Sequence, residues 1–142
     1  MTQTMKYRIL TLLFCLTAVV GAEAKRVKAQ QMYLLGFSAS FKDSVVYITD
    51  IQDIQGAWID KKSNTLLGRD NYSAQMKEYF DKHQQPNRVC VTFFDTSRKK
   101  IEKRLEKLKK RYVLKQPGLY DVRYLTATDF KYEAVDMAPD EE

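Results

Sequence analysis

The chain has 142 residues, of which 24 are basic and 18 acidic, and its formal net charge at pH 7 is +6. This length suits a single domain, and the apolar share of 44% is enough for a modest core. With two cysteines and one histidine, the composition excludes a disulfide-rich scaffold and a zinc site built from histidine and cysteine alone.

The first 24 residues have the pattern of a secretory signal peptide. Lys6 and Arg8 supply a positive start, residues 9–20 form an uncharged apolar run, and Ala22-Glu23-Ala24 fits a cleavage site. This run is too short to cross a bilayer as a helix. We therefore expect an exported protein, periplasmic or secreted after cleavage near Ala24, with no transmembrane segment in the mature chain. An uncleaved N-terminal anchor is the alternative.

The remaining chain divides into a lead-in, one domain and a tail. Residues 25–31 are a polar lead-in, residues 32–135 are predicted to form a single α+β domain, and residues 136–142 are acidic and predicted to be disordered. Cys90 is the only cysteine after the signal peptide, so no internal disulfide is expected. We interpret Cys90 as a small apolar residue of a buried strand.

Alternating apolar residues predict a β-hairpin at the start of the domain. Residues 32–41 form its first strand, residues 42–44 the turn, and residues 45–54 its second strand. Residues 56–71 have no regular pattern and contain the only tryptophan, Trp58, which we interpret either as a core residue or as a platform for a ligand.

A shorter helix is predicted from Asn71 or Tyr72 to His83. After it, residues 88–112 have the clearest pattern of the chain beyond the N-terminus, that of a strand, a turn and a second helix. Residues 89–94 are β-branched or aromatic and apolar on both faces, which predicts a strand inside the sheet rather than at its edge. Residues 95–97 can cap a helix. The following apolar residues have helical spacing and predict one narrow stripe: Ile101, Leu105, Leu108 and Tyr112.

Most of the positive charge lies in this second helix. Nine basic and two acidic residues occur between Arg98 and Arg111, so the rest of the chain after residue 24 has more acidic than basic residues. A local positive surface on such a body predicts an anion-binding site, and a solvated helix face is the alternative interpretation. The candidate binding residues are Lys100, Lys103, Lys107 and Arg111, together with Trp58.

The last strand is predicted at residues 120–128, with an extension over residues 130–135. The element order is therefore β-β-α-β-α-β. It predicts a mixed four-stranded sheet with two helices mainly on one face. The strands at residues 89–94 and 120–128 are expected to be parallel neighbours joined by a helical crossover.

No catalytic constellation is visible in the sequence. His83 lies near a helix end, with no nearby serine or cysteine that suggests a triad. The best carboxylate cluster is Asp50, Asp53 and Asp60, which could cut glycosides or bind calcium but is explained equally well by solvated turns. We therefore predict a protein that is not an enzyme, with no cofactor, no metal and no nucleic-acid partner.

Residues 91–94, a short polar turn and a lysine-rich helix with Leu105 and Leu108 resemble the strand-helix half of SPOR domains. These are small exported peptidoglycan-binding modules with a four-stranded sheet and two helices, so the resemblance implies a glycan partner. The SPOR element order, β-α-β-β-α-β, differs from the one predicted here, and no glycan-binding residue is carried over. The chain is also similar to small exported proteins of anaerobic Gram-negative bacteria.

These patterns lead us to expect an exported, non-catalytic binding module of the cell envelope. Its basic helix face would bind peptidoglycan, another anionic glycan or an envelope protein. One alternative is a small envelope hydrolase that uses Asp50, Asp53 or Asp60 beside Trp58. The other is a structural or assembly subunit that pairs through a sheet edge, using a strand of the hairpin or the strand at Tyr120.

Overall fold

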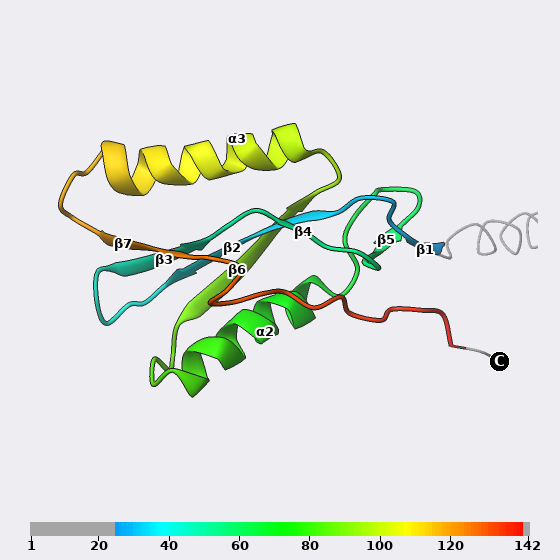
Figure 1. The fold of residues 1–142 in the computed structure, drawn as a ribbon, viewed down its shortest axis with the longest axis horizontal. Coiled ribbons are helices and arrows are strands. Elements are labelled where there is room, and N and C mark those ends of the chain that lie inside the picture. Colours follow the sequence, from blue (N-terminus) through cyan, green and yellow to red (C-terminus); the bar gives the residue numbers. More distant parts are fainter. Residues whose placement is uncertain (1–24, 141–142) are drawn as a thin grey trace, which may run out of the picture.

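The computed structural model describes residues 25–140, so the predicted signal peptide lies outside the described residues. It shows a five-stranded mixed sheet with a helix on each side and a separate two-stranded sheet at one end (Figure 1). This arrangement confirms the predicted α+β class and element order, with additional short strands. Within residues 25–140, no helix is long and apolar enough to span a membrane.

Strand β2 (Tyr33–Ala39) is the centre of the main sheet. It pairs antiparallel with β3 (Val45–Thr49) and β4 (Gln52–Asp53) on one side and with β6 (Val89–Asp95) on the other. Strand β7 (Asp121–Leu125) pairs parallel with β3. The β2–β3 hairpin is therefore interior. Of the strands that we expected to pair with a partner, β2 and β3 of the hairpin have neighbours on both sides, whereas the strand at Tyr120, β7, lies at an edge.

The predicted second strand is interrupted between β3 and β4, which gives five strands in place of four. The backbone N–H of Asp50 donates to the carbonyl of Leu125 at 3.0 Å, and its carboxylate accepts from the N–H of Ala127 at 3.2 Å. These bonds hold the segment between β3 and β4 against the end of β7 and the turn after it. On the other side, the N–H of Gly36 in β2 donates to the Thr49 hydroxyl at 2.8 Å in place of a backbone carbonyl.

Helices α2 (Arg69–Lys82) and α3 (Arg98–Lys109) cover opposite faces of the sheet (Figure 1). Neighbouring residues of β2 point to opposite faces, so Leu34 belongs to the core under α2, whereas Leu35 belongs to the core that contains Ile101 of α3. The prediction that both helices lie mainly on one face is wrong. A central strand that is apolar on both faces needs a cover on each.

Strand β6 is an edge strand among the described residues, because β2 is its only partner in the sheet. The prediction of an interior position is wrong, since the two apolar faces of β6 are explained by α2 on one side and α3 on the other. Strands β6 and β7 run in the same direction, as expected, but they are not neighbours. The crossover through α3 passes over both β2 and β3.

The start of α3 follows the sequence pattern. The Ser97 hydroxyl accepts from the N–H of Lys100 at 3.4 Å, and Asp95 accepts from the N–H of Ser97 at 2.8 Å. These bonds satisfy donors that a helix start leaves free. The predicted stripe faces the sheet, as its members all belong to the second core: Ile101, Leu105, Leu108 and Tyr112.

Two short strands lie in segments for which no strand was predicted. Strand β1 (Arg26–Lys28) of the lead-in pairs antiparallel with β5 (Trp58–Asp60) of the irregular segment. Lys28 Nζ lies 5.6 Å from the centre of the Trp58 ring. A three-residue strand is too short to show a reliable alternation in sequence.

After β7, the chain turns and runs across the α2 face as an extended segment that is not a strand (Figure 1). The Gln52 side chain donates to the carbonyl of Phe130 at 2.9 Å and accepts from the N–H of Tyr132 at 2.8 Å. The Gln75 side chain makes the same two bonds to Glu133, so side-chain amides replace the predicted strand extension over residues 130–135. The described part of the acidic tail, residues 136–140, contains no helix or strand, and its disorder stays a prediction.

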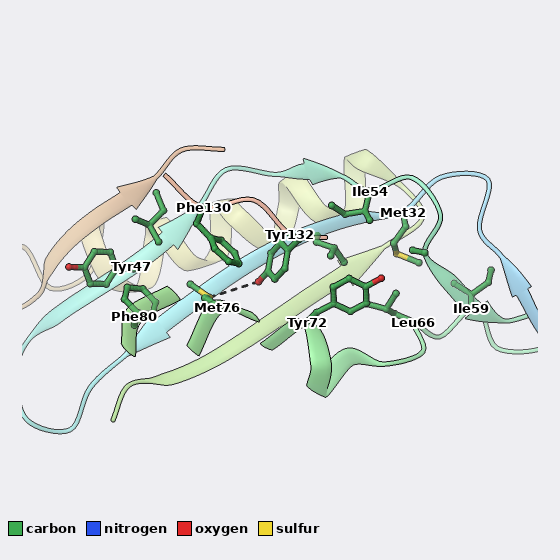
Figure 2. Close-up of a cluster of buried hydrophobic side chains, with 13 residues drawn as sticks. Met32, Tyr47, Ile54, Ile59, Leu66, Tyr72, Met76, Phe80, Phe130 and Tyr132 are labelled. Carbon is green, nitrogen blue, oxygen red and sulfur yellow. Dashed lines mark hydrogen bonds between the residues drawn. The ribbon is translucent and has the colours of Figure 1, made fainter. Parts of the chain in front are cut away.

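Gly36 of β2 makes room for this segment. Tyr132 Oη lies 3.0 Å from Thr92 Oγ1 and 3.9 Å from Met76 Sδ (Figure 2). A Cβ on Gly36 would lie 2.6 Å from that Oη and 2.8 Å from the methyl carbon of Thr49. The glycine is therefore required by the close approach of the C-terminal segment.

We predict that Gly36→Ala lowers the free energy of unfolding by about 1–3 kcal/mol, because the added methyl overpacks the core. Denaturant titration measures this loss. Tyr132→Phe removes the atom nearest to the new methyl, so the double variant should lose less stability than the two single losses added together. Strict additivity would contradict the proposed packing.

We also predict a specific loss of stability at alkaline pH. Burial raises the pKa of Tyr132 from 10.0 to about 12. Between these values the unfolded chain releases this proton and the folded chain keeps it, so the stabilisation falls as the pH rises from 10 towards 12. Tyr132→Phe should make the decline in unfolding midpoint shallower, whereas Tyr124→Phe, at a half-exposed position, should leave it unchanged.

Candidate functional site

One side of α3 carries a continuous row of cations. This row, termed the basic flank, consists of Lys100, Arg104, Lys107 and Arg111. Their spacing places them on the same side of the helix. The guanidinium of Arg104 lies 4.9 Å from the centre of the Phe93 ring, which shows that the flank faces β6. On the opposite side, Arg98 forms an ion pair with Glu102 at 3.1 Å.

A hollow of about 260 Å³ lies between the basic flank and the end of β6. Its lining consists of Phe94, Asp95, Lys100, Ile101, Lys103, Arg104 and Lys107. The single carboxylate in this lining belongs to Asp95, which accepts the N–H of Ser97. The hollow therefore has four cations around one carboxylate that already has a partner.

A larger hollow, termed the end cleft, lies at the C-terminal end of α3 and has a volume of about 600 Å³. It is lined by Lys107, Lys110, Arg111, Lys115, Gln116 and Tyr120. The Tyr120 ring packs edge-to-face on Tyr112 at 4.9 Å, and Tyr112 packs on Phe37 of β2 at 5.1 Å. This aromatic row anchors one wall of a cationic cleft to the sheet.

The end cleft depends on a change of helix type. Helix α3 continues as a π-helix, η1 (Lys110–Leu114), and the N–H of Lys115 donates to the carbonyl of Lys110 at 2.9 Å. This bond spans five residues, so the turn contains one residue more than an α-helical turn. As a result, Lys115 lines the same cleft as Lys107 and Arg111.

The cations of the basic flank and end cleft have no ion-pair partner within residues 25–140. Ion pairs in this part of the chain join Lys82 to Glu78, Arg88 to Asp43, Arg98 to Glu102, and Arg123 to Asp121. Like charges that stand side by side without counter-charges produce a positive potential at the surface. The arrangement is thus suited to binding an anion that has several charged groups.

The structure brings four of the five predicted binding residues together. Lys100, Lys103 and Lys107 line the smaller hollow, and Lys107 and Arg111 line the end cleft. Trp58 is not part of this surface. It lies in the small sheet, which is at the opposite end of the molecule from the end cleft (Figure 1).

Several residues of the surface were not predicted. Helical spacing could have identified Arg104, four residues after Lys100. Lys110 lies on the same helix, further towards the solvent-facing side. No sequence signal pointed to Lys115, Gln116 or Tyr120, because their positions depend on the π turn and on the packing of the loop after it.

The three candidate aspartates each bond within their own neighbourhood. Asp50 accepts from Ala127, Asp53 accepts from the Gln55 side chain at 3.2 Å, and Asp60 accepts from the N–H of Lys62 at 2.9 Å. No group of three histidine, cysteine, aspartate or glutamate residues in the described chain is placed to hold a metal ion. These bonds are typical of turn residues.

The surroundings of His83 and of Cys90 indicate a structural role for each residue. His83 caps the C-terminal end of α2, as expected, with Nδ1 2.7 Å from the carbonyl oxygen of Tyr79 and its ring 4.1 Å from the Tyr79 ring. Cys90 is half-buried, and burial raises the pKa of its thiol. The reactive thiolate form is therefore disfavoured at neutral pH.

No family model matches the chain, and neither a curated protein nor a solved structure matches it. The resemblance to SPOR domains therefore stays a prediction. The functional argument depends on the charge, shape and position of the surface itself.

Proposed function

We propose that the protein is an exported, non-catalytic binding module of the cell envelope. In this proposal the basic face of α3, made up of the basic flank, Lys103 and the end cleft, binds an anionic polymer such as peptidoglycan or another anionic glycan. The observation that carries the proposal is the unbroken row of cations without ion-pair partners in the described chain. The signal-like pattern of the first 24 residues supports export.

The shape of the surface favours an extended ligand. The two hollows adjoin along α3 and share Lys107, so together they form one open surface that follows the helix. An enclosed pocket would be typical of a small-molecule site. A polymer with carboxylates at repeated intervals can contact several of these cations at once, which strengthens binding through many weak contacts.

We predict that replacing Lys100, Lys107 and Arg111 with Gln weakens cosedimentation with purified sacculi by about tenfold at low salt, since each exposed charge contact contributes a fraction of the total. Unfolding should remain cooperative, because these side chains are exposed. The dissociation constant of each variant is measured by titration of sacculi.

A matched control removes the same charge from the small sheet and its turn. Lys25, Lys61 and Lys62 are exposed and lie outside the basic face. Their replacement with Gln should leave sacculus binding nearly unchanged. Equal losses in the two triple variants would show that only the net charge matters, and would count against a specific basic face.

A further inference from the structure

Exposed large apolar side chains gather at one end of the molecule. Among the described residues, the most exposed is Phe41, at 96%, followed by Leu114 at 71% and Leu119 at 54%. Val89 and Val113 are also exposed, and Tyr124 is the one such residue placed elsewhere, on β7. An apolar group of this kind on a small protein indicates a contact surface.

These residues come from segments that are far apart in the sequence. Phe41 lies in the turn after β2, whereas Leu114 and Leu119 lie in the connection from α3 to β7. The N–H of Asp121 donates to the carbonyl of Ser44 at 2.9 Å, which joins this connection to the β2–β3 turn. Both segments lie at the left end of the molecule in Figure 1.

The same end carries positive charge without matching negative charge. The carboxylates of the β2–β3 turn and of the start of β7 already have arginine partners: Asp43 lies 3.6 Å from Arg88, and Asp121 lies 2.8 Å from Arg123. By contrast, four further cations of this end make no ion pair within residues 25–140: Lys42, Lys110, Arg111 and Lys115. Exposed apolar side chains therefore lie at the same end of the molecule as a group of cations.

This combination fits an anionic lipid surface better than a polar polymer. Side chains at loop tips can enter the boundary between headgroups and acyl chains, and nearby lysines and arginines can contact the phosphates. The end cleft, whose lining includes Lys115 and Tyr120, the chain neighbours of Leu114 and Leu119, has room and charge for a headgroup phosphate. A glycan chain would leave Phe41 without an apolar environment.

We propose that this end of the protein docks on the surface of an anionic lipid bilayer. Phe41, Leu114 and Leu119 enter the bilayer boundary, while Lys42 and the cations of the end cleft contact the phosphates. The contact is peripheral and reversible. It goes beyond the proposed polymer binding because it uses apolar side chains that are not part of the basic flank.

The test is cosedimentation of the protein with vesicles of phosphatidylglycerol and phosphatidylcholine, compared with vesicles of phosphatidylcholine alone. The protein is expected to bind the anionic vesicles. The triple variant Phe41→Ser, Leu114→Ser and Leu119→Ser keeps every charge and should bind them at least about tenfold more weakly. Tyr124→Ser, which removes the exposed aromatic outside this end, should bind as the wild type does.

A charge variant tests the cations separately. Lys42→Gln should weaken vesicle binding about fivefold, whereas Lys61→Gln, at the opposite end of the molecule, should have little effect. Leu114→Trp gives a direct reading of insertion: its emission should shift to shorter wavelength when anionic vesicles are added. Trp58 lies in the small sheet and should show no such shift.

The proposal is overturned if the wild type does not bind anionic vesicles, or if the serine variant binds them as tightly as the wild type. In the second case charge alone would explain the attraction. Self-association that the serine variant abolishes, without any vesicle binding, would assign the surface to a second copy of the chain. Sacculus binding tests the proposed polymer binding separately. The serine variant should still bind sacculi, and a wild-type protein that does not bind sacculi would leave the vesicle-docking proposal unaffected.

Discussion

The rest of the structure depends on β2, a strand that has neighbours on both sides and a helix over each face. Its side chains divide between two cores, so α2 and α3 must lie on opposite sides of the sheet. Its middle residue, Gly36, also leaves the space into which Tyr132 packs. A change at this strand therefore affects the two cores and the C-terminal segment together.

The central position of β2 also determines where the candidate surface forms. Because β6 and β7 run in the same direction at opposite edges, α3 must return across the sheet and end beside the start of β7. That return places the end of α3 next to the β2–β3 turn, where Asp121 bonds to Ser44. The cations of the helix and the apolar loop tips meet there as a consequence of the chain path.

The sides of α3 differ in charge, and each side has its own role in stability or in binding. The narrow stripe that begins at Ile101 supplies the packing, and the Arg98–Glu102 pair lies on the side away from β6. The basic flank makes no ion pair within residues 25–140, so it is available for a ligand at little cost to the fold. The two proposals share the end cleft: polymer binding combines it with the side of the helix, and membrane docking combines it with the exposed apolar side chains near its end.

The sequence by itself determined the α+β class, the order of the main elements, a helix cap within residues 95–97 and the helical placement of Lys100, Lys107 and Arg111, because these depend on local periodicity and local hydrogen bonds. Only the tertiary structure decided that β6 is an edge strand and that the helices cover opposite faces. An apolar strand face looks the same in sequence whether a helix or another element covers it. The tertiary structure also decided the positions of two other residues. Lys115 reaches the cleft only through the π turn, and the pairing of β5 with β1 keeps Trp58 away from the basic face.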